Sequence, residues 1–221
     1  MTDITYPPTM TIEDSQNNSD LDNQDAAWAS INTPLHIDAL LVFIQDVERL
    51  LRINPMLEFK KWEKLGASQY FMAGRNISQE TPFEFETKLT VFRRPNGLEI
   101  EYESGVKAST VIEVEAIELE DGKLGSKLTI TDHYDRLDEE TRQARIDEVD
   151  KSLINWATDL QRYLVTWRRW SRIKLWRLYM QHVWLPMKPT GRRITYMILW
   201  ISVVEVALIA LGVGIYFSEY R

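Results

Sequence analysis

This chain of 221 residues offers few candidates for catalytic or metal-binding chemistry. It contains no cysteine and three histidines, which excludes disulfides, catalytic thiols and cysteine-based metal sites. His36 and His133 fall on different predicted elements, and His133 lies on the outward row of its strand. No glycine-rich phosphate loop, nucleophile elbow or Ser/His/Asp arrangement is visible. We therefore expect no metal site and assign no catalytic residue.

Asp132 is the acid best placed for chemistry, because it falls on the predicted inward row of a strand between Ile130 and Tyr134. In a pocket it could orient a ligand hydroxyl or act as a base. Near the end of the strand it would instead be solvated at the rim, and this second interpretation is favoured. The side chains predicted to line a pocket are Phe83, Phe85, Tyr102, Asp132, Tyr134 and Trp156.

These side chains need a sheet to position them. Residues 27–32 are predicted to form a first strand, and Thr33-Pro34 then supplies the N-cap and first position of a helix. Asn54-Pro55 ends that helix. From residue 62 to 134, short runs of alternating apolar and polar residues are separated by turn signals such as Arg94-Pro95-Asn96-Gly97. This alternation predicts an antiparallel meander with one apolar face.

A long helix is predicted after the strands. One apolar stripe unites Ile146, Val149, Leu153, Trp156, Ala157, Leu160 and Leu164. The fold class is therefore α+β, with a curved antiparallel sheet of about six to seven strands wrapped on a long C-terminal helix. One helix does not fill the concave face of such a sheet, so we expect a cavity between them.

The order of elements resembles the helix-grip superfamily, which includes StAR-related lipid-transfer domains, polyketide cyclases and coenzyme-Q-binding proteins. The matching residues are the strand running into Asn32-Thr33-Pro34, the segment from Val47-Glu48-Arg49 to Asn54-Pro55, and the last strand, Leu128 to Tyr134. The resemblance covers about residues 25–165 and is architectural. It implies a pocket for a lipid, isoprenoid, quinone or polyketide, and no cofactor beyond such a bound molecule. The family shares no catalytic residues, so none is carried over.

The sequence departs from the family in two places. The loop after Tyr134 is strongly acidic, with Asp135, Asp138, Glu139 and Glu140. The C-terminal helix is also predicted to continue into a segment rich in tryptophan and arginine, until Leu185-Pro186 and Lys188-Pro189-Thr190-Gly191 break it.

Charge is distributed unevenly along the chain. Residues 1–161 hold 16 basic against 31 acidic residues, whereas residues 162–193 hold nine basic and no acidic ones. An acidic body argues against a nucleic-acid partner. On a single helical wheel, Tyr163, Leu164, Trp167, Trp170, Leu175 and Leu178 face one side. The residues predicted to meet a membrane interface are Trp167, Arg168, Arg169, Trp170, Arg172, Trp176, Arg177, Trp184, Arg192 and Arg193. Single-stranded nucleic acid is the less favoured partner, and docking to a protein at membrane level stays open.

Residues 194–217 are apolar apart from Glu205, a length that crosses a bilayer. Arg192 and Arg193 precede this span, so we expect the N-terminal body to be cytoplasmic and the C-terminus to lie on the opposite side. A charge at mid-span is costly. We therefore favour a partner-facing role for Glu205, although a tolerated, protonated glutamate is the alternative. The residues predicted to contact an integral-membrane partner are Glu205, Ala210, Gly212 and Gly214.

The sequence thus predicts four parts: a disordered acidic arm (1–25), a helix-grip domain (26–165), an interfacial helix and linker (166–191), and a transmembrane helix with a short tail (192–221). The favoured function is a membrane-anchored module that binds a hydrophobic ligand. An accessory subunit of a membrane complex is the first alternative. A cyclase or hydrolase acting on a lipid-like substrate is the second, and the less favoured because no catalytic set is visible.

Overall fold

A single antiparallel sheet forms the body of the protein. The computed structural model describes residues 26–79, 81–119, 122–134 and 139–219, with the backbone alone for 139–151 and 219. The strands are β1 (Ala26–Thr33), β2 (Leu57–Lys64), β3 (Gln69–Asn76), β4 (Phe83–Arg94), β5 (Gly97–Tyr102), β6 (Ser109–Glu118) and β7 (Leu124–His133). Their order is β1-β7-β6-β5-β4-β3-β2, and every neighbouring pair is antiparallel. The predicted fold class, with seven strands and a long C-terminal helix, is confirmed.

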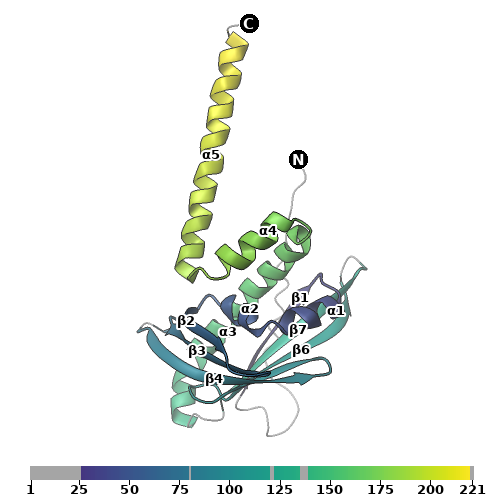
Figure 1. Cartoon of the computed structure of the whole chain (residues 1–221), viewed down its shortest axis with the longest axis vertical. Coiled ribbons are helices and arrows are strands. Elements are labelled where there is room, and N and C mark those ends of the chain that lie inside the picture. The colour runs from purple at the N-terminus through teal and green to yellow at the C-terminus, as the bar shows by residue number, and fades with distance from the viewer. Residues whose placement is uncertain (1–25, 80, 120–121, 135–138, 220–221) are drawn as a thin grey trace.

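The helices lie on one side of this sheet and beyond it (Figure 1). They are α1 (Ile37–Ile44), α2 (Val47–Arg52), α3 (Glu139–Trp170), α4 (Lys174–Tyr179), the π-helical turn η1 (Met180–Trp184) and α5 (Pro189–Glu219). In Figure 1, α5 extends away from the sheet, and α4 lies between α5 and the sheet domain. The structure therefore separates a sheet domain from one projecting helix.

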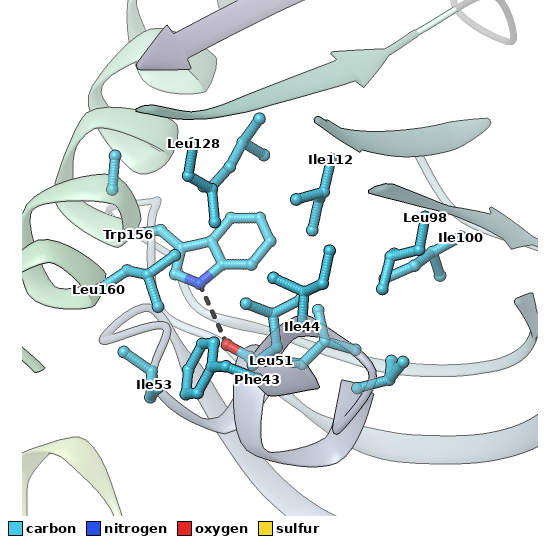
Figure 2. Packing of buried hydrophobic residues seen from close by; sticks show 14 of the residues in the cluster. Phe43, Ile44, Leu51, Ile53, Leu98, Ile100, Ile112, Leu128, Trp156 and Leu160 are labelled. Atoms are coloured by element: carbon cyan, nitrogen blue, oxygen red, sulfur yellow. Dashed lines mark hydrogen bonds between the residues drawn. The ribbon is translucent and has the colours of Figure 1, made fainter. Parts of the chain in front are cut away.

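The core lies between the sheet and the first three helices, because the alternating strands turn their apolar rows inward. Ile112 and Leu128 from the sheet are fully buried together with Trp156 and Leu160 of α3 (Figure 2). The Trp156 indole N–H donates to the carbonyl oxygen of Leu50 on α2 at 3.2 Å. This bond matters because the last carbonyls of a short helix have few partners within the helix.

The segment after β1 holds two helices where the sequence predicts one. Thr33 ends β1, and its hydroxyl accepts the Leu35 N–H at 3.0 Å in place of capping a helix. A break then falls at Asp46, whose carboxylate accepts the Arg49 N–H at 3.2 Å and caps α2. Aspartate competes in this way with continued helical bonding, and this explains the break.

The second and third strands are longer than the short runs predicted from alternation. β2 begins at Leu57, and its register with β3 shifts between Phe59 and Lys61, which marks a β-bulge. A bulge interrupts the period of two, so the alternating signal disappears there. A Cβ on Gly74 of β3 would lie 2.5 Å from the Glu58 carbonyl oxygen, so the close approach of these strands requires glycine at this position.

The chain beyond the sheet domain forms a helical hairpin, and the prediction of one continuous helical wheel is wrong there. α3 does run on to Trp170, as expected, but Ile173 is extended and α4 with η1 then runs back along α3. The ring centroids of Trp167 and Trp176 lie 5.4 Å apart, as do those of Tyr163 and Trp184. Burying these rings against each other outweighs continuing the helix. The predicted break is confirmed at residues 185–188, but it is shorter than expected, because α5 begins at Pro189 and includes Thr190 and Gly191.

Some predicted features lie outside the described residues. They are the arm at 1–25, the turn residue Asp121, the acidic loop from Asp135 to Asp138, and the side chains of Glu139, Glu140, Ile146 and Val149.

Candidate functional site

A cavity of about 420 Å³ lies between strands β2 to β5, the β5–β6 connection, the segment after α2, and α3. Its described lining is mostly apolar, and the large side chains are Leu51, Leu57, Met72, Phe83, Phe85 and Trp156. Alternation on β4 explains part of this wall, because Phe83, Phe85 and Thr87 fall on the same face of the strand. A cavity of this size and character suits a small apolar or amphipathic molecule.

One end of the cavity is polar and charged. The Asp132 carboxylate is fully buried, and it forms an ion pair with Lys107 and accepts a hydrogen bond from Thr110 Oγ1 at 2.5 Å. The Tyr134 hydroxyl lies 3.4 Å from the same carboxylate. Strand pairing explains the cluster, because Thr110 on β6 stands opposite Asp132 on β7. The Lys107 ammonium lies 5.7 Å from the centre of the Trp156 ring and lines the cavity itself.

The protons of this cluster can be assigned from the chemistry of the groups. Thr110 has one hydroxyl proton, which it donates to the Asp132 carboxylate. The Tyr102 hydroxyl, 3.0 Å from Thr110 Oγ1, is therefore the donor of that pair. Burial raises the pKa of Tyr102 well above its usual value, and the negative charge of Asp132 raises it further. Tyr102 consequently stays protonated over the whole physiological range.

Five of the six side chains predicted to line a pocket do line the cavity. They are Phe83, Phe85, Tyr102, Tyr134 and Trp156. The favoured interpretation of Asp132 as a solvated residue at the strand end is wrong, because its carboxylate is fully buried and contacts Lys107, Thr110 and Tyr134. Asp132 stands behind the lining and acts on the cavity through Lys107. A role for any of these residues in binding a ligand stays a prediction.

Sequence reasoning missed Lys107 and the other polar or charged residues of the lining, which are Asn54, Asn76, Ser78, Gln79, Glu84, Glu86, Thr87, Ser104 and Ser152. Lys107 and Ser104 belong to the β5–β6 connection, where no period relates a residue to a face. Nothing in the sequence marks Lys107 among the other lysines. Ser152 stands one turn before Trp156 on α3, so the helical period could have found it. Among the described residues, no three His, Cys, Asp or Glu side chains are grouped to hold a metal ion.

A second cluster joins α2 to the helical hairpin around a buried arginine. The Arg49 guanidinium lies 3.7 Å from the ring centre of Trp167 and 4.8 Å from that of Phe43. Its Nε donates to the Tyr163 hydroxyl at 2.9 Å. Burial raises the pKa of Tyr163, while Arg49 opposes that shift. Trp167, Trp176 and Trp184, all predicted to face a membrane, therefore lie partly buried on the core of the domain.

The start of α5 is fastened to the end of η1 by Arg192. Its Nε donates to the carbonyl oxygen of Trp184 at 3.1 Å and its Nη2 to that of Leu185 at 2.9 Å. The guanidinium also lies 4.1 Å from the Trp184 ring centre. Arg192, predicted to lie at the interface, is thus buried within the joint. The remaining predicted interface residues are exposed: Arg168, Arg169, Trp170, Arg172, Arg177 and Arg193.

The projecting helix is exposed from Tyr196 to Ser218. Residues Pro189–Ser218 are long and apolar enough to cross a membrane, and none of the apolar stretch is buried in the chain itself. Glu205 and Ala210 are exposed on it, and a Cβ added to Gly212 or Gly214 would meet nothing. This exposure is what a helix embedded in lipid or packed on another protein needs. The predicted partner contacts of these four residues stay predictions.

No protein-family model matches the chain, and no curated protein is significantly similar to it in sequence. Several solved structures are similar in fold. A START superfamily protein from Mycobacterium smegmatis aligns at 10% identity over 63% of this chain and 97% of its own, with a TM-score of 0.45. A STAR-related lipid transfer protein from Xanthomonas axonopodis aligns at 8% identity over 63% and 85%, with a TM-score of 0.40. The di-domain ARO/CYC StfQ from the steffimycin biosynthetic pathway aligns at 8% identity over 65% and 52%, with a TM-score of 0.43.

These similar structures are a START superfamily protein, a lipid transfer protein and an ARO/CYC protein. At such identities and TM-scores they carry no argument about a ligand or a reaction. The fold class rests on the strand order and the long helix of the chain itself.

Proposed function

We propose that this protein binds one hydrophobic molecule in the cavity between the sheet and α3, while α5 holds the domain at a membrane. The observation that carries the proposal is the cavity of about 420 Å³, whose large aromatic and aliphatic side chains lie among polar residues and whose one end carries Lys107. Such a lining suits an amphipathic molecule with an apolar body and a polar head, such as a lipid, an isoprenoid or a quinone. The Lys107 ammonium would meet a carbonyl or anionic oxygen of that head.

The position of the domain follows from α5 and from the charges before it. With Lys188, Arg192 and Arg193 at the start of the span, we propose that the sheet domain lies on the cytoplasmic side.

Mass spectrometry of the full-length protein tests the binding proposal. Protein purified in a mild detergent is extracted with organic solvent, and a hydrophobic compound is expected at near one per chain. Ser152→Trp fills the cavity from α3 and should abolish this compound. Val42→Trp, at an exposed site on α1, is the matched control and should keep it. An empty wild-type cavity, or equal content in both variants, would contradict the proposal.

A role as subunit of a membrane complex is a second candidate, favoured by the exposed mid-span position of Glu205 on α5. An ionisable group there usually faces a protein partner or a polar path. Mild-detergent purification of wild-type protein and of Glu205→Gln tests it. A co-purifying membrane protein that is lost in the variant supports this role, whereas a monomer that co-purifies with nothing contradicts it.

A further inference from the structure

The face of the α4–η1 segment that turns away from the domain is apolar and uncovered. Its large residues are Ile173, Leu175, Leu178, Tyr179 and Val183, which we call the outer face. Leu175 is 77% exposed and Leu178 is 54% exposed. His182 lies among these residues, and its Nδ1 lies 3.2 Å from the Leu178 carbonyl oxygen of the preceding helical turn. An exposed apolar face of this kind marks a surface that contacts a membrane or another protein.

The opposite face of the same segment is fixed to the domain. Trp176, Met180 and Trp184 follow one another at intervals of four, which places them on one side of a helix. All three pack against the core, where Trp176 contacts Trp167 and Trp184 contacts Tyr163. The tryptophans therefore serve as the inner face of the hairpin, and the outer face is held in a defined direction.

Two observations favour membrane lipid as the partner of the outer face. Only residues 185–188 separate η1 from α5, the candidate membrane span, so the face begins beside the point where the chain enters a bilayer. Five exposed side chains near it are basic, namely Arg168, Arg169, Arg172, Lys174 and Arg177, and residues 162–193 contain no acid. An apolar face bordered by cations is the composition of a helix lying in the headgroup region of an anionic membrane.

We infer that α4 and η1 lie in the membrane interface with the outer face inserted among lipids, while Trp167, Trp176 and Trp184 stay within the protein. This inference rests on the proposed insertion of α5. Together with the Arg192 contacts to Trp184 and Leu185, it gives the domain two points of attachment, the span and the inserted face. Two attachments fix the direction in which the sheet domain faces, which a single flexible tether does not.

Single cysteines with an environment-sensitive fluorophore test this inference, since the chain has no cysteine of its own. Full-length Leu175→Cys and Leu178→Cys are labelled and placed in vesicles of phosphatidylcholine and phosphatidylglycerol. The expected result is quenching by nitroxide-bearing lipid and protection from aqueous iodide at both sites. Val42→Cys on α1 is the exposed control and should show the reverse. Trp176→Cys should be poorly reached by either quencher, because its side chain faces the core.

Leu208→Cys on α5 separates this inference from the proposed anchor. If the label at residue 208 is quenched from lipid but that at 175 behaves like that at 42, α5 inserts and the outer face does not, so the inference is overturned. A label at 175 protected from both quenchers indicates protein contact, which also overturns it. If the label at 208 is itself reached by iodide, the membrane anchoring in the proposed function fails.

Discussion

Replacing Trp156 by phenylalanine tests how α3 holds α2 against the sheet. The indole N–H donates to the Leu50 carbonyl at 3.2 Å, and both residues are fully buried. The Asn54 N–H, which would reach that carbonyl in a longer helix, bonds Leu51 instead. Phenylalanine therefore leaves the Leu50 carbonyl without this donor, at a cost of about 1–3 kcal/mol. The smaller ring adds about 1 kcal/mol of lost burial.

The expected loss for Trp156→Phe is thus about 2–4 kcal/mol in the free energy of unfolding, or roughly 4–16 °C in Tm for a chain of this size. Urea unfolding of the full-length protein in detergent, followed by far-UV circular dichroism, measures it. Hydrogen exchange should rise in α2, because the helix loses the group that satisfies its end. Trp28→Phe on β1, 43% exposed, is the matched control and should change stability by less than about 0.5 kcal/mol.

A loss for Trp156→Phe as small as that of Trp28→Phe, with unchanged exchange in α2, would refute the reasoning. It would mean that the indole bond and the ring contacts contribute little to joining α3 and α2. An increase in exchange confined to α3 would also count against it, since the argument places the lost bond at Leu50 on α2.

Three other predictions concern the charged and polar groups of the interior. Lys107→Met and Asp132→Asn should each lower the free energy of unfolding, because each removes one partner of the buried ion pair. The double variant should lose less than the sum of the two single losses, by about 0.5–3 kcal/mol, and a double-mutant cycle by urea unfolding measures this coupling. Arg49→Lys should be less stable than the wild-type protein by about 0.5–2 kcal/mol in the free energy of unfolding, measured with urea, because an ammonium is more strongly hydrated and does not stack on Trp167 as a guanidinium does. Wild-type stability in this variant would contradict the stacking argument. Burial raises the pKa of Tyr102 in the folded state, so its contribution to stability is present below about pH 10 and is lost as pH rises beyond that value. Tyr102→Phe should therefore reduce the fall in the free energy of unfolding above about pH 10, which urea unfolding at a series of pH values measures.

The order of strands and helices could be predicted because it depends on local patterns. Alternation over Phe83–Arg94 and the turn before Gly97 both appear in the structure at the expected places. The β-bulge in β2 and the Asp46 cap could not be predicted in the same way. A bulge breaks the period on which the prediction depends, and a cap competes with a helix whose apolar pattern continues through it.

The candidate site could be predicted only where a regular period places a side chain on one face of a strand. Side chains on regular strands, such as Phe85 and Tyr102, could be placed on the inward face from their period. Lys107 lies in an irregular connection and reaches Asp132 across 25 positions of sequence, a contact that no local pattern encodes. Asp132 is buried because Lys107, Thr110 and Tyr134 gather around its carboxylate, which only the folded sheet brings about.

The sequence alone determined the segments that depend on composition and period: the long apolar stretch of α5, the basic run before it, and the α+β order of elements. These are local properties, and a residue's neighbours in the chain are sufficient to define them. Only the tertiary structure decided which way the Trp/Arg segment faces. A helical wheel assumes that the helix continues, but the chain reverses at residues 171–173. The reversal packs Trp176 against Trp167 and Trp184 against Tyr163. Burial of those rings against a distant arginine, Arg49, leaves Leu175 and Leu178 outside.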